Sequence, residues 1–307
     1  VCGSHTAAIE KHGIRSLLSQ NIRLISGPGC PVCVTPTAYI DRLISLAMEE
    51  KTCVVTFSDM LRVPGSSLSL SEAKLKGAHV TDVYSPMGAV SLARENPDKN
   101  YIFAAVGFET TAPVYTFMLE EAEKENIRNL KFLTAVKTMP DAIRFLLEAK
   151  DKIDGFIAPG HVCAVTGADY FSDIADKYKT PFCVAGFNPK ELLLAIYCLA
   201  KMTETGEYGV KNCYTSVVED RLKKENLDRL YRFFDSTDAV WRGIGEIKGS
   251  ALTLNKKYAE KYDAGSNGLT DDNIRSNGCI CGQILTGRSV PRSEEHTSEL
   301  QSHHDLV

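Results

Sequence analysis

Short apolar runs alternate with amphipathic stretches along most of this 307-residue chain. After a brief apolar run at 22–25, runs rich in β-branched and aromatic residues predict strands at 52–57, 80–84, 101–106, 130–136, 153–158, 181–185 and 213–218. Apolar residues at helical spacing predict helices at 37–50, 71–77, 88–95, 112–126, 140–149, 166–178, 189–202 and 221–234. Strands that alternate with helices of about 10–15 residues are typical of βαβ units and parallel sheets.

This pattern predicts an α/β fold with two similar parallel-sheet βαβ domains. We expect an N-terminal segment at 1–20, a first domain at 21–127 and a second domain at 128–250. Two predicted strands end in related sequences, Ala-Ala-Val-Gly-Phe at 104–108 and Val-Ala-Gly-Phe at 184–187, which favours two related halves. Because ligands bind at the carboxyl ends of parallel strands, we expect the two domains to face a central cleft that holds the site.

The composition is that of a globular protein, with 44% hydrophobic and 24% charged residues. No stretch approaches about 18 uninterrupted apolar residues, so we expect no association with a membrane. The net charge of −4 gives no basic field, so we expect no nucleic-acid partner. Ten cysteines are too few for a disulfide scaffold of this length. We therefore expect a reducing, cytoplasmic setting, in which paired cysteines serve metal or redox chemistry.

The pair Cys30-Pro-Val-Cys33 is the strongest single motif. Its two-residue spacer brings both sulfur atoms within reach of each other or of one metal ion. The preceding Gly27-Pro28-Gly29 favours a tight turn, and a helix that begins just after the pair would lower the pKa of a thiol. A redox dithiol, half of a zinc site, a metal–thiolate site and a pair of buried structural cysteines all remain open on this motif alone.

Five other polar residues lie at the start of the chain or after predicted strands. Cys2 and His5 are close enough in sequence for the imidazole to orient or deprotonate the thiol. Asp59 and Glu109 each follow a strand, where a carboxylate serves a site or caps the next helix. His161 also follows a strand, a position that favours a functional histidine over a core histidine.

The remaining chemistry-bearing residues give weaker signals. Cys53, Cys183, Cys198 and Cys213 lie in apolar runs, where we expect them to pack as small apolar residues. Cys163 is left open because it is close to His161. No phosphate-binding or dinucleotide-binding glycine motif follows a predicted strand, so a nucleotide site has no support.

Nine motifs taken together are more specific than any of them alone. In chain order they are Cys2-Gly-Ser-His-Thr6, Ser26-Gly-Pro-Gly-Cys-Pro-Val-Cys-Val-Thr35, Thr56-Phe-Ser-Asp-Met60, Arg62-Val-Pro-Gly65, Val83-Tyr-Ser-Pro86, Gly107-Phe-Glu-Thr-Thr-Ala-Pro113, Pro159-Gly-His-Val162, Trp241-Arg-Gly243 and Cys279-Ile-Cys-Gly282. Across residues 1–291 this order resembles the HypD family of hydrogenase maturation proteins. Three positions depart from the family pattern, since Ser4 and Ser58 stand where glycine is usual and Cys163 where serine is common.

The resemblance implies an assembly scaffold rather than a conventional turnover enzyme. On such a scaffold, iron acquires one carbon monoxide and two cyanides for nickel–iron hydrogenase. The implied partners are a HypC-type small chaperone, a HypE-type protein that donates cyanide as a thiocyanate and, indirectly, the hydrogenase large subunit. By the same resemblance we expect Cys2 to bind iron and Cys30 and Cys33 to form a redox pair. The residues expected to handle protons or orient ligands are His5, Asp59, Glu109 and His161.

The resemblance also implies a four-iron, four-sulfur cluster in the intact parent protein. We expect residues 251–291 to be the truncated, poorly packed start of that cluster domain, with Cys279 and Cys281 as candidate ligands. Residues 292–307 read like a translated sequencing adapter, and we expect both ends of the chain to be cut. A cluster needs four ligands, so we expect this chain to bind no stable cluster.

Two other functions compete with the scaffold on sequence grounds. The first is a stand-alone thiol–disulfide oxidoreductase that uses Cys30 and Cys33 and acts on general disulfides without iron. The second is a structural zinc protein, which would bind about one zinc ion per chain through several thiolates. Metal analysis under anaerobic conditions separates all three.

Overall fold

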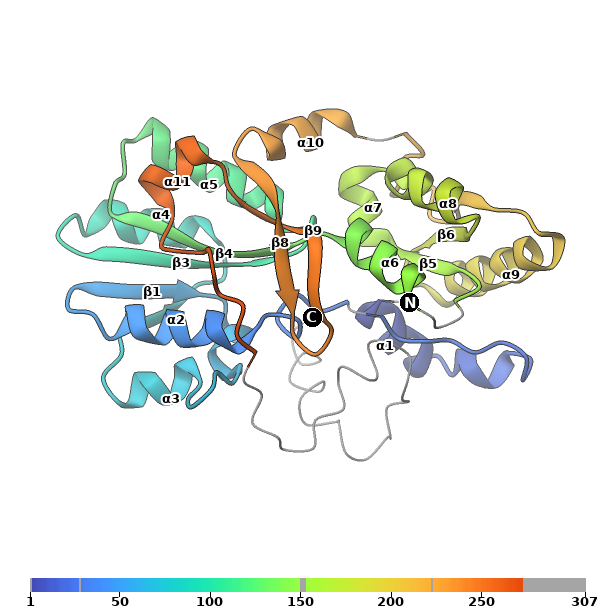
Figure 1. The fold of residues 1–307 in the computed structure, drawn as a ribbon, viewed down its shortest axis with the longest axis horizontal. Helices are drawn as coiled ribbons and strands as arrows, with labels where there is room; N and C mark the ends of the chain where they lie inside the picture. Colours follow the sequence, from blue (N-terminus) through green and yellow to red (C-terminus); the bar gives the residue numbers. More distant parts are fainter. Residues whose placement is uncertain (1, 28, 150–152, 222, 273–307) are drawn as a thin grey trace. The chain divides into compact units, whose positions relative to one another are not determined.

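The computed structural model describes residues 2–27, 29–149, 153–221 and 223–272. They fall into two compact units. Of the described residues, unit 1 contains those up to Cys30 together with Thr138–Asp228, and unit 2 contains Pro31–Lys137 together with 229–272. Both units combine helices with parallel strands, so the expected α/β class is confirmed (Figure 1).

Unit 2 is built on a six-stranded sheet with the order β2-β1-β3-β4-β9-β8. Its strands are β1 (Thr52–Thr56), β2 (Val80–Asp82), β3 (Asn100–Gly107), β4 (Leu130–Lys137), β8 (Phe234–Trp241) and β9 (Gly245–Leu254). The first four strands are parallel, whereas β9 is antiparallel to both β4 and β8. After its first residue, β3 is buried along its whole length, as expected for a parallel strand covered on both faces.

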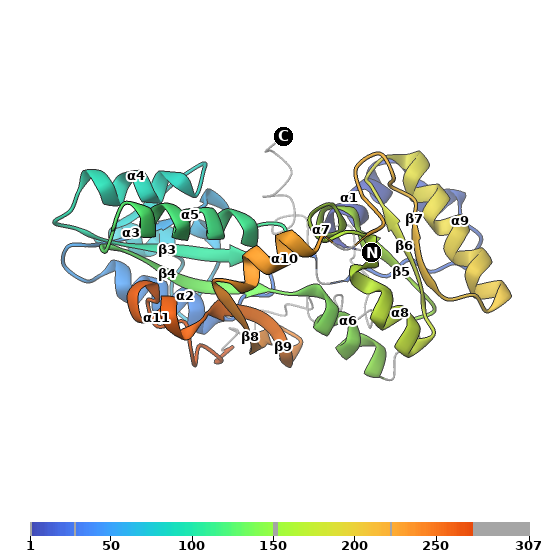
Figure 2. The same ribbon diagram turned by 90° about the horizontal axis from the view of Figure 1, so that it is seen from above.

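Helices cover both faces of this sheet (Figures 1 and 2). They are α2 (Thr37–Ala47), α3 (Leu70–Leu75), α4 (Met87–Glu95), α5 (Ala112–Lys124) and α11 (Lys256–Tyr262), with a short 3₁₀ segment, η2 (Ser58–Arg62). Phe103 meets Tyr115 and Phe132 edge to face in the core that α4, α5 and α11 share. From the opposite face, Tyr39 of α2 donates a hydrogen bond of 2.7 Å to the carbonyl of Leu133.

The six-stranded sheet corrects the sequence-based division of the chain at 127/128. β4 was expected in the second domain, but it pairs with β3 from Tyr101 opposite Leu130 to Gly107 opposite Val136. The reason is that β3, α5 and β4 form one βαβ unit, whose crossover returns the chain beside the strand it left. The hairpin of β8 and β9 then extends this sheet with antiparallel strands that the sequence analysis did not predict.

Unit 1 is built on a smaller, parallel sheet with the order β5-β6-β7. Its elements are α1 (Gly3–Lys11), η1 (Ile14–Leu17), α6 (Met139–Glu148), β5 (Phe156–Pro159), α7 (Gly160–Thr166), η3 (Ala168–Phe171), α8 (Ser172–Tyr178), β6 (Pro181–Ala185), α9 (Pro189–Thr205) and β7 (Gly209–Asn212), and α10 (Lys224–Tyr231) crosses the boundary to unit 2. Ile9 of α1 is buried in the core of β6 and α9, so the segment 1–20 belongs to this unit. The two sheets differ in size and strand direction, so two similar halves are not confirmed.

Strand β7 lies earlier than the expected strand at 213–218. Asn212 accounts for the difference, because its side chain ends the strand in a turn. Its Oδ1 accepts a hydrogen bond from the backbone amide of Tyr214, and its Nδ2 donates to the carbonyl of Val218. An asparagine that binds its own neighbours in this way overrides the β-propensity of the residues that follow.

Residues 251–264 contribute to the core of unit 2, which corrects for this part the expectation that 251–291 packs poorly. Leu252 of β9 and Tyr258 and Tyr262 of α11 are buried in the core of unit 2. These residues complete the six-stranded sheet and its cover instead of starting a separate domain. The other part of the expected iron–sulfur segment, 273–291, and the expected tail at 292–307 lie outside the described residues.

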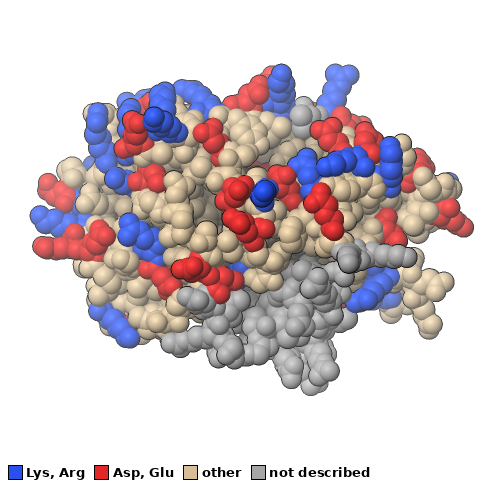
Figure 3. All heavy atoms as spheres, in the orientation of Figure 1, with Lys and Arg blue, Asp and Glu red and all other residues tan. Residues whose placement is uncertain are grey.

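The surface carries charges of both signs. On the face shown in Figure 3, lysine and arginine side chains are interspersed with aspartate and glutamate, in line with the small net charge of the sequence. Among the described residues, none of the helices combines the length and the apolar character that crossing a bilayer requires.

The packing of α11 predicts the cost of truncating its central tyrosine. Tyr258 is 1% exposed, and its ring lies 4.6 Å from that of Phe233. Tyr258→Ala should lower the free energy of unfolding by about 3–5 kcal/mol, the usual cost of deleting a buried aromatic ring. Tyr84→Ala is the matched control because Tyr84 is fully exposed and should change stability by less than about 0.5 kcal/mol. Urea unfolding measures both, and equal stabilities would show that α11 is not part of the core.

Candidate functional site

The histidine of the first motif is buried at the end of β6 in unit 1. His5 lies in the first turn of α1, and its Nε2 atom is 3.1 Å from the carbonyl oxygen of Ala185. Because a carbonyl oxygen only accepts hydrogen bonds, Nε2 carries the proton and Nδ1 keeps a lone pair. Within the described part of the chain, this buried Nδ1 atom has no hydrogen-bond partner.

The second expected histidine lies beside the first. His161 is the second residue of α7, and its ring centroid is 4.3 Å from that of Phe187. The ring of His5 lies 4.8 Å from the same phenyl ring. Gly160 makes this arrangement possible, because a Cβ atom there would lie 2.4 Å from the carbonyl oxygen of Ala185. The close approach of two strand ends thus explains the glycine in the Pro-Gly-His motif.

Both imidazoles are neutral at pH 7. Burial lowers the pKa of His5 from 6.5 to about 4, and the nearby His161 contributes in the same direction. Burial also lowers the pKa of His161 from its usual value. Neutral imidazoles can accept a proton or bind a metal ion, whereas imidazolium ions can do neither.

Cys2 precedes His5 by three residues, at the N-cap of α1. Burial raises the pKa of its thiol, and hydrogen bonds from the backbone amides of His5 and Ser4 act in the opposite direction. The backbone of Gly29 packs against this cap, since a Cβ atom on Gly29 would lie 2.2 Å from the backbone nitrogen of Gly3. Gly29 therefore brings the backbone next to Cys30 against that of Cys2.

The Cys30–Cys33 motif differs from the expectation in one respect. The boundary between the units falls directly after Cys30, so Cys33 is assigned to unit 2. Residues 31–34 form a turn, and α2 begins only at Thr37 because Pro36 is its extended N-cap. The pair is thus not at the first turn of a helix, and the expected effect of a helix dipole on its thiols does not apply.

The two expected carboxylates follow neighbouring strands of unit 2. Glu109 follows β3 and is 1% exposed, in a turn closed by the Thr111 hydroxyl, which accepts from the amide of Phe108 at 3.1 Å. Asp59 lies in η2 after β1 and is exposed. Burial raises the pKa of Tyr115, and the charge of Asp59 acts in the same direction. Since β1 and β3 are parallel neighbours, both carboxylates lie at one edge of the sheet. A cleft that joins them to the histidines of unit 1 stays a prediction.

A cluster of three thiols was missed by the sequence analysis. Cys183 of β6, Cys198 of α9 and Cys213 after β7 are joined by side-chain hydrogen bonds. The thiol of Cys183 stabilises the thiolate of Cys213 and so lowers its pKa, while the pKa of Cys183 is raised. The sequence could have indicated this cluster through the prediction that consecutive parallel strands are neighbours. Strands β6 and β7 pair directly, which brings Cys183 and the residue after β7, Cys213, to adjacent strands.

The described residues offer no cage of side chains for a metal ion. No group of three or more histidine, cysteine, aspartate or glutamate side chains in the described ranges is arranged to hold one. The candidate cluster ligands Cys279 and Cys281 lie outside the described residues. The cluster of the parent protein and its absence here both stay predictions.

Comparison with known proteins assigns the chain to a family. A family model described as HypD, hydrogenase formation hypA family, matches residues 1–296. The chain belongs to the HypD family. It is 39% identical to the hydrogenase maturation factor HypD of Escherichia coli (strain K12) and 37% identical to those of Rhodobacter capsulatus and Azotobacter vinelandii. Each match covers 95% of this chain and 79% of the relative. The chain is thus a hydrogenase maturation factor of the HypD type, and the resemblance carried by the nine motifs is confirmed.

The buried neutral His5 predicts a loss of stability in acid. Its pKa is about 4 in the folded protein and near 6.5 when unfolded, so the unfolded chain binds the extra proton between these values. Stability from this group is complete above pH 6.5 and falls by about 3 kcal/mol as the pH drops to about 4. Urea unfolding at several pH values should show a shallower acid dependence for His5→Gln.

His12→Gln is the matched control for this experiment. His12 is the exposed C-cap of the same helix, so its removal should leave the acid dependence as in the unchanged protein. If His5→Gln and His12→Gln have the same acid dependence, His5 is not the buried neutral group described here.

Proposed function

We propose that this HypD protein is a scaffold on which the iron centre of nickel–iron hydrogenase acquires carbon monoxide and cyanide. The observation that carries the proposal is the grouping of Cys2, His5 and His161 around the end of β6. A partly buried thiol beside neutral imidazoles suits a soft metal cargo, because the site offers sulfur and nitrogen donors without a fixed positive charge. The family assignment supports the same function.

Iron is the cargo of this site. Cys2 supplies a thiolate, which suits iron that also carries strong-field ligands. Burial raises the pKa of this thiol, so its proton must leave when iron binds. His5 keeps a lone pair at Nδ1 that is suited to accept a proton at the buried site. The remaining iron ligands come from the diatomic molecules and from a partner protein.

Cys30 and Cys33 supply the electrons for cyanide release. A thiocyanate on the donor protein needs two electrons and one proton to break its sulfur–carbon bond, which yields a thiol and cyanide. Oxidation of two thiols to a disulfide provides two electrons and two protons, so the second proton passes to a base such as a neutral imidazole. The tight turn at residues 31–34 keeps the two cysteines close along the chain.

The proposed partners follow from this chemistry. A HypC-type small chaperone completes the iron coordination, a HypE-type protein delivers cyanide, and the hydrogenase large subunit receives the finished centre indirectly. A reducing, cytoplasmic location suits free thiols and a reactive iron centre. Asp59 and Glu109 are assigned to proton handling or ligand orientation at the sheet edge of unit 2.

A stand-alone thiol–disulfide oxidoreductase is the alternative, favoured by the Cys-Pro-Val-Cys spacing. It differs from the scaffold in one measurable respect. An oxidoreductase reduces a small aromatic disulfide repeatedly in the presence of a thiol reductant and without iron, whereas the scaffold needs iron and its partner for its reaction.

The iron assignment predicts the effect of removing one sulfur atom. Cys2→Ala in complex with the small chaperone should lose the infrared bands of iron-bound carbon monoxide and cyanide, together with the bound iron. Cys53→Ala is the matched control because Cys53 is a partly buried cysteine on β1 of unit 2. Bands of unchanged intensity in Cys2→Ala would remove Cys2 from the site.

The redox assignment predicts a different defect for the dithiol. Cys30→Ser or Cys33→Ser should retain iron on Cys2 but fail to release cyanide from the donor. Differential alkylation followed by mass spectrometry should show a new Cys30–Cys33 disulfide only after the unchanged protein has reacted with the thiocyanate donor. Cyanide transfer at the normal rate by either serine variant would contradict the role of the pair.

A further inference from the structure

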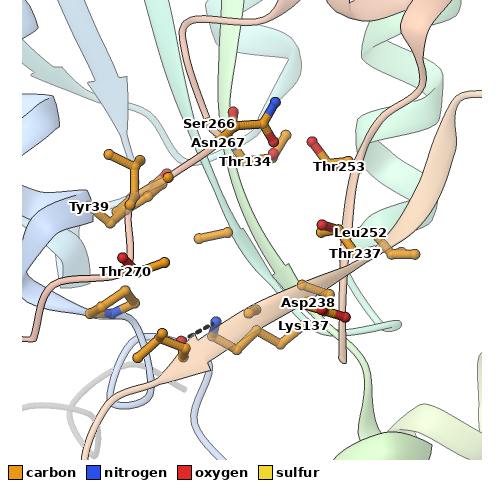
Figure 4. Close-up of a pocket in the computed structure, with 17 residues that line it drawn as sticks. Tyr39, Thr134, Lys137, Thr237, Asp238, Leu252, Thr253, Ser266, Asn267 and Thr270 are labelled. Atoms are coloured by element: carbon orange, nitrogen blue, oxygen red, sulfur yellow. Dashed lines mark hydrogen bonds between the residues drawn. The ribbon is translucent and has the colours of Figure 1, made fainter. Parts of the chain in front are cut away.

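A small polar pocket in unit 2 lies outside the site described above. Its volume is about 110 Å3, enough for an ion of a few heavy atoms. It lies between the carboxyl-terminal part of β4, the hairpin of β8 and β9, and the chain at 266–270 (Figure 4). The polar side chains of Thr134, Thr237, Thr253 and Asn267 line it, and none of them makes a hydrogen bond within the described part of the chain.

Lys137 lines this pocket and is the unusual residue in it. The side chain is 2% exposed, and its Nζ atom donates a hydrogen bond of 2.9 Å to the carbonyl of Val240, drawn as a dashed line in Figure 4. The same atom lies 5.6 Å from the centre of the Trp241 ring, within the range of a cation–π contact. An ammonium group has three donors, so two remain beyond the bond to Val240.

The charge of this lysine is not balanced by the described residues. None of their carboxylates lies within 4.0 Å of Nζ, and burial alone accounts for the lowering of the Lys137 pKa to about 7. The other titratable residues that line the pocket are Tyr39 on α2 and Asp238 on β8. Tyr39 is neutral, and Asp238 is exposed, where its carboxylate accepts a hydrogen bond from the amide of Gly249. A buried cation without a partner is costly unless an anion joins it.

We propose that this pocket is a binding site for a small monovalent anion, held by Lys137 and the surrounding hydroxyl and amide groups. One buried cation balances one negative charge. The carboxylate of Asp238 at the exposed side disfavours ions with two charges. The neutral lining groups can donate further hydrogen bonds to the anion.

Trp241 gives this proposal a direct readout, because it is the single tryptophan of the chain and is fully buried. Collisional quenchers reach such a ring poorly, so neutral acrylamide should quench its fluorescence weakly. Iodide that binds beside Lys137 should instead quench it strongly and in a saturable way. Nitrate should displace iodide at lower concentration than sulfate does. Linear, weak quenching by iodide, or stronger competition by sulfate, would overturn the proposal.

Variants and pH separate binding at Lys137 from general charge effects. Lys137→Met should lose saturable quenching, whereas Lys248→Met, which removes an exposed lysine from β9, should keep it. In the unchanged protein, iodide affinity should fall about tenfold from about pH 6 to about pH 8, because the amine loses its charge around pH 7. Lys137→Arg should bind without this pH dependence, since arginine stays charged. If the methionine variant does not fold, a flat pH profile of the unchanged protein still refutes the site.

Discussion

The carbonyl group of Ala185 determines the geometry of the candidate site in unit 1. It accepts the hydrogen bond from His5, and Gly160 packs against it without a side chain between them. The bond to His5 fixes which ring nitrogen carries the proton, and the contact with Gly160 sets the start of α7, where His161 lies. One backbone oxygen at the end of a central strand thus determines the orientation of one imidazole and the position of the other.

Most helices and strands and several candidate site residues could be predicted from the sequence, because they depend on the pattern of neighbouring residues along the chain. Strand and helix periods predicted most elements, and the rule that sites follow parallel strands selected Glu109 and His161. The partnership of His5 with Ala185 could not be predicted, since it depends on where α1 returns to the sheet. The hairpin of β8 and β9 was missed because its strands mix polar and apolar residues, and Asn212 ended β7 through side-chain bonds that propensity does not capture.

The two units show how the same local pattern leads to different sheets. In unit 2, a βαβ series is closed by an antiparallel hairpin, which places Lys137 and Trp241 beside each other at the junction of β4 with β8 and β9. In unit 1, three parallel strands suffice because α1 and α9 cover them with apolar residues. The alternation of strands and helices therefore predicts the fold class. The order of the strands and the pairs of residues in contact depend on the packing of segments that are distant in the sequence.

The missing side chains of Gly29 and Gly160 have a consequence for genetic screens of this family. Neither residue has a reactive group, yet a single methyl group at either position would overlap the backbone that holds Cys2 or His5. In a scan of all substitutions, these glycines should therefore tolerate few replacements. A list of intolerant positions would therefore contain two kinds of residue: residues whose side chains take part in the chemistry, and glycines at which any side chain would overlap the neighbouring backbone. The set of replacements that each position accepts distinguishes the two kinds.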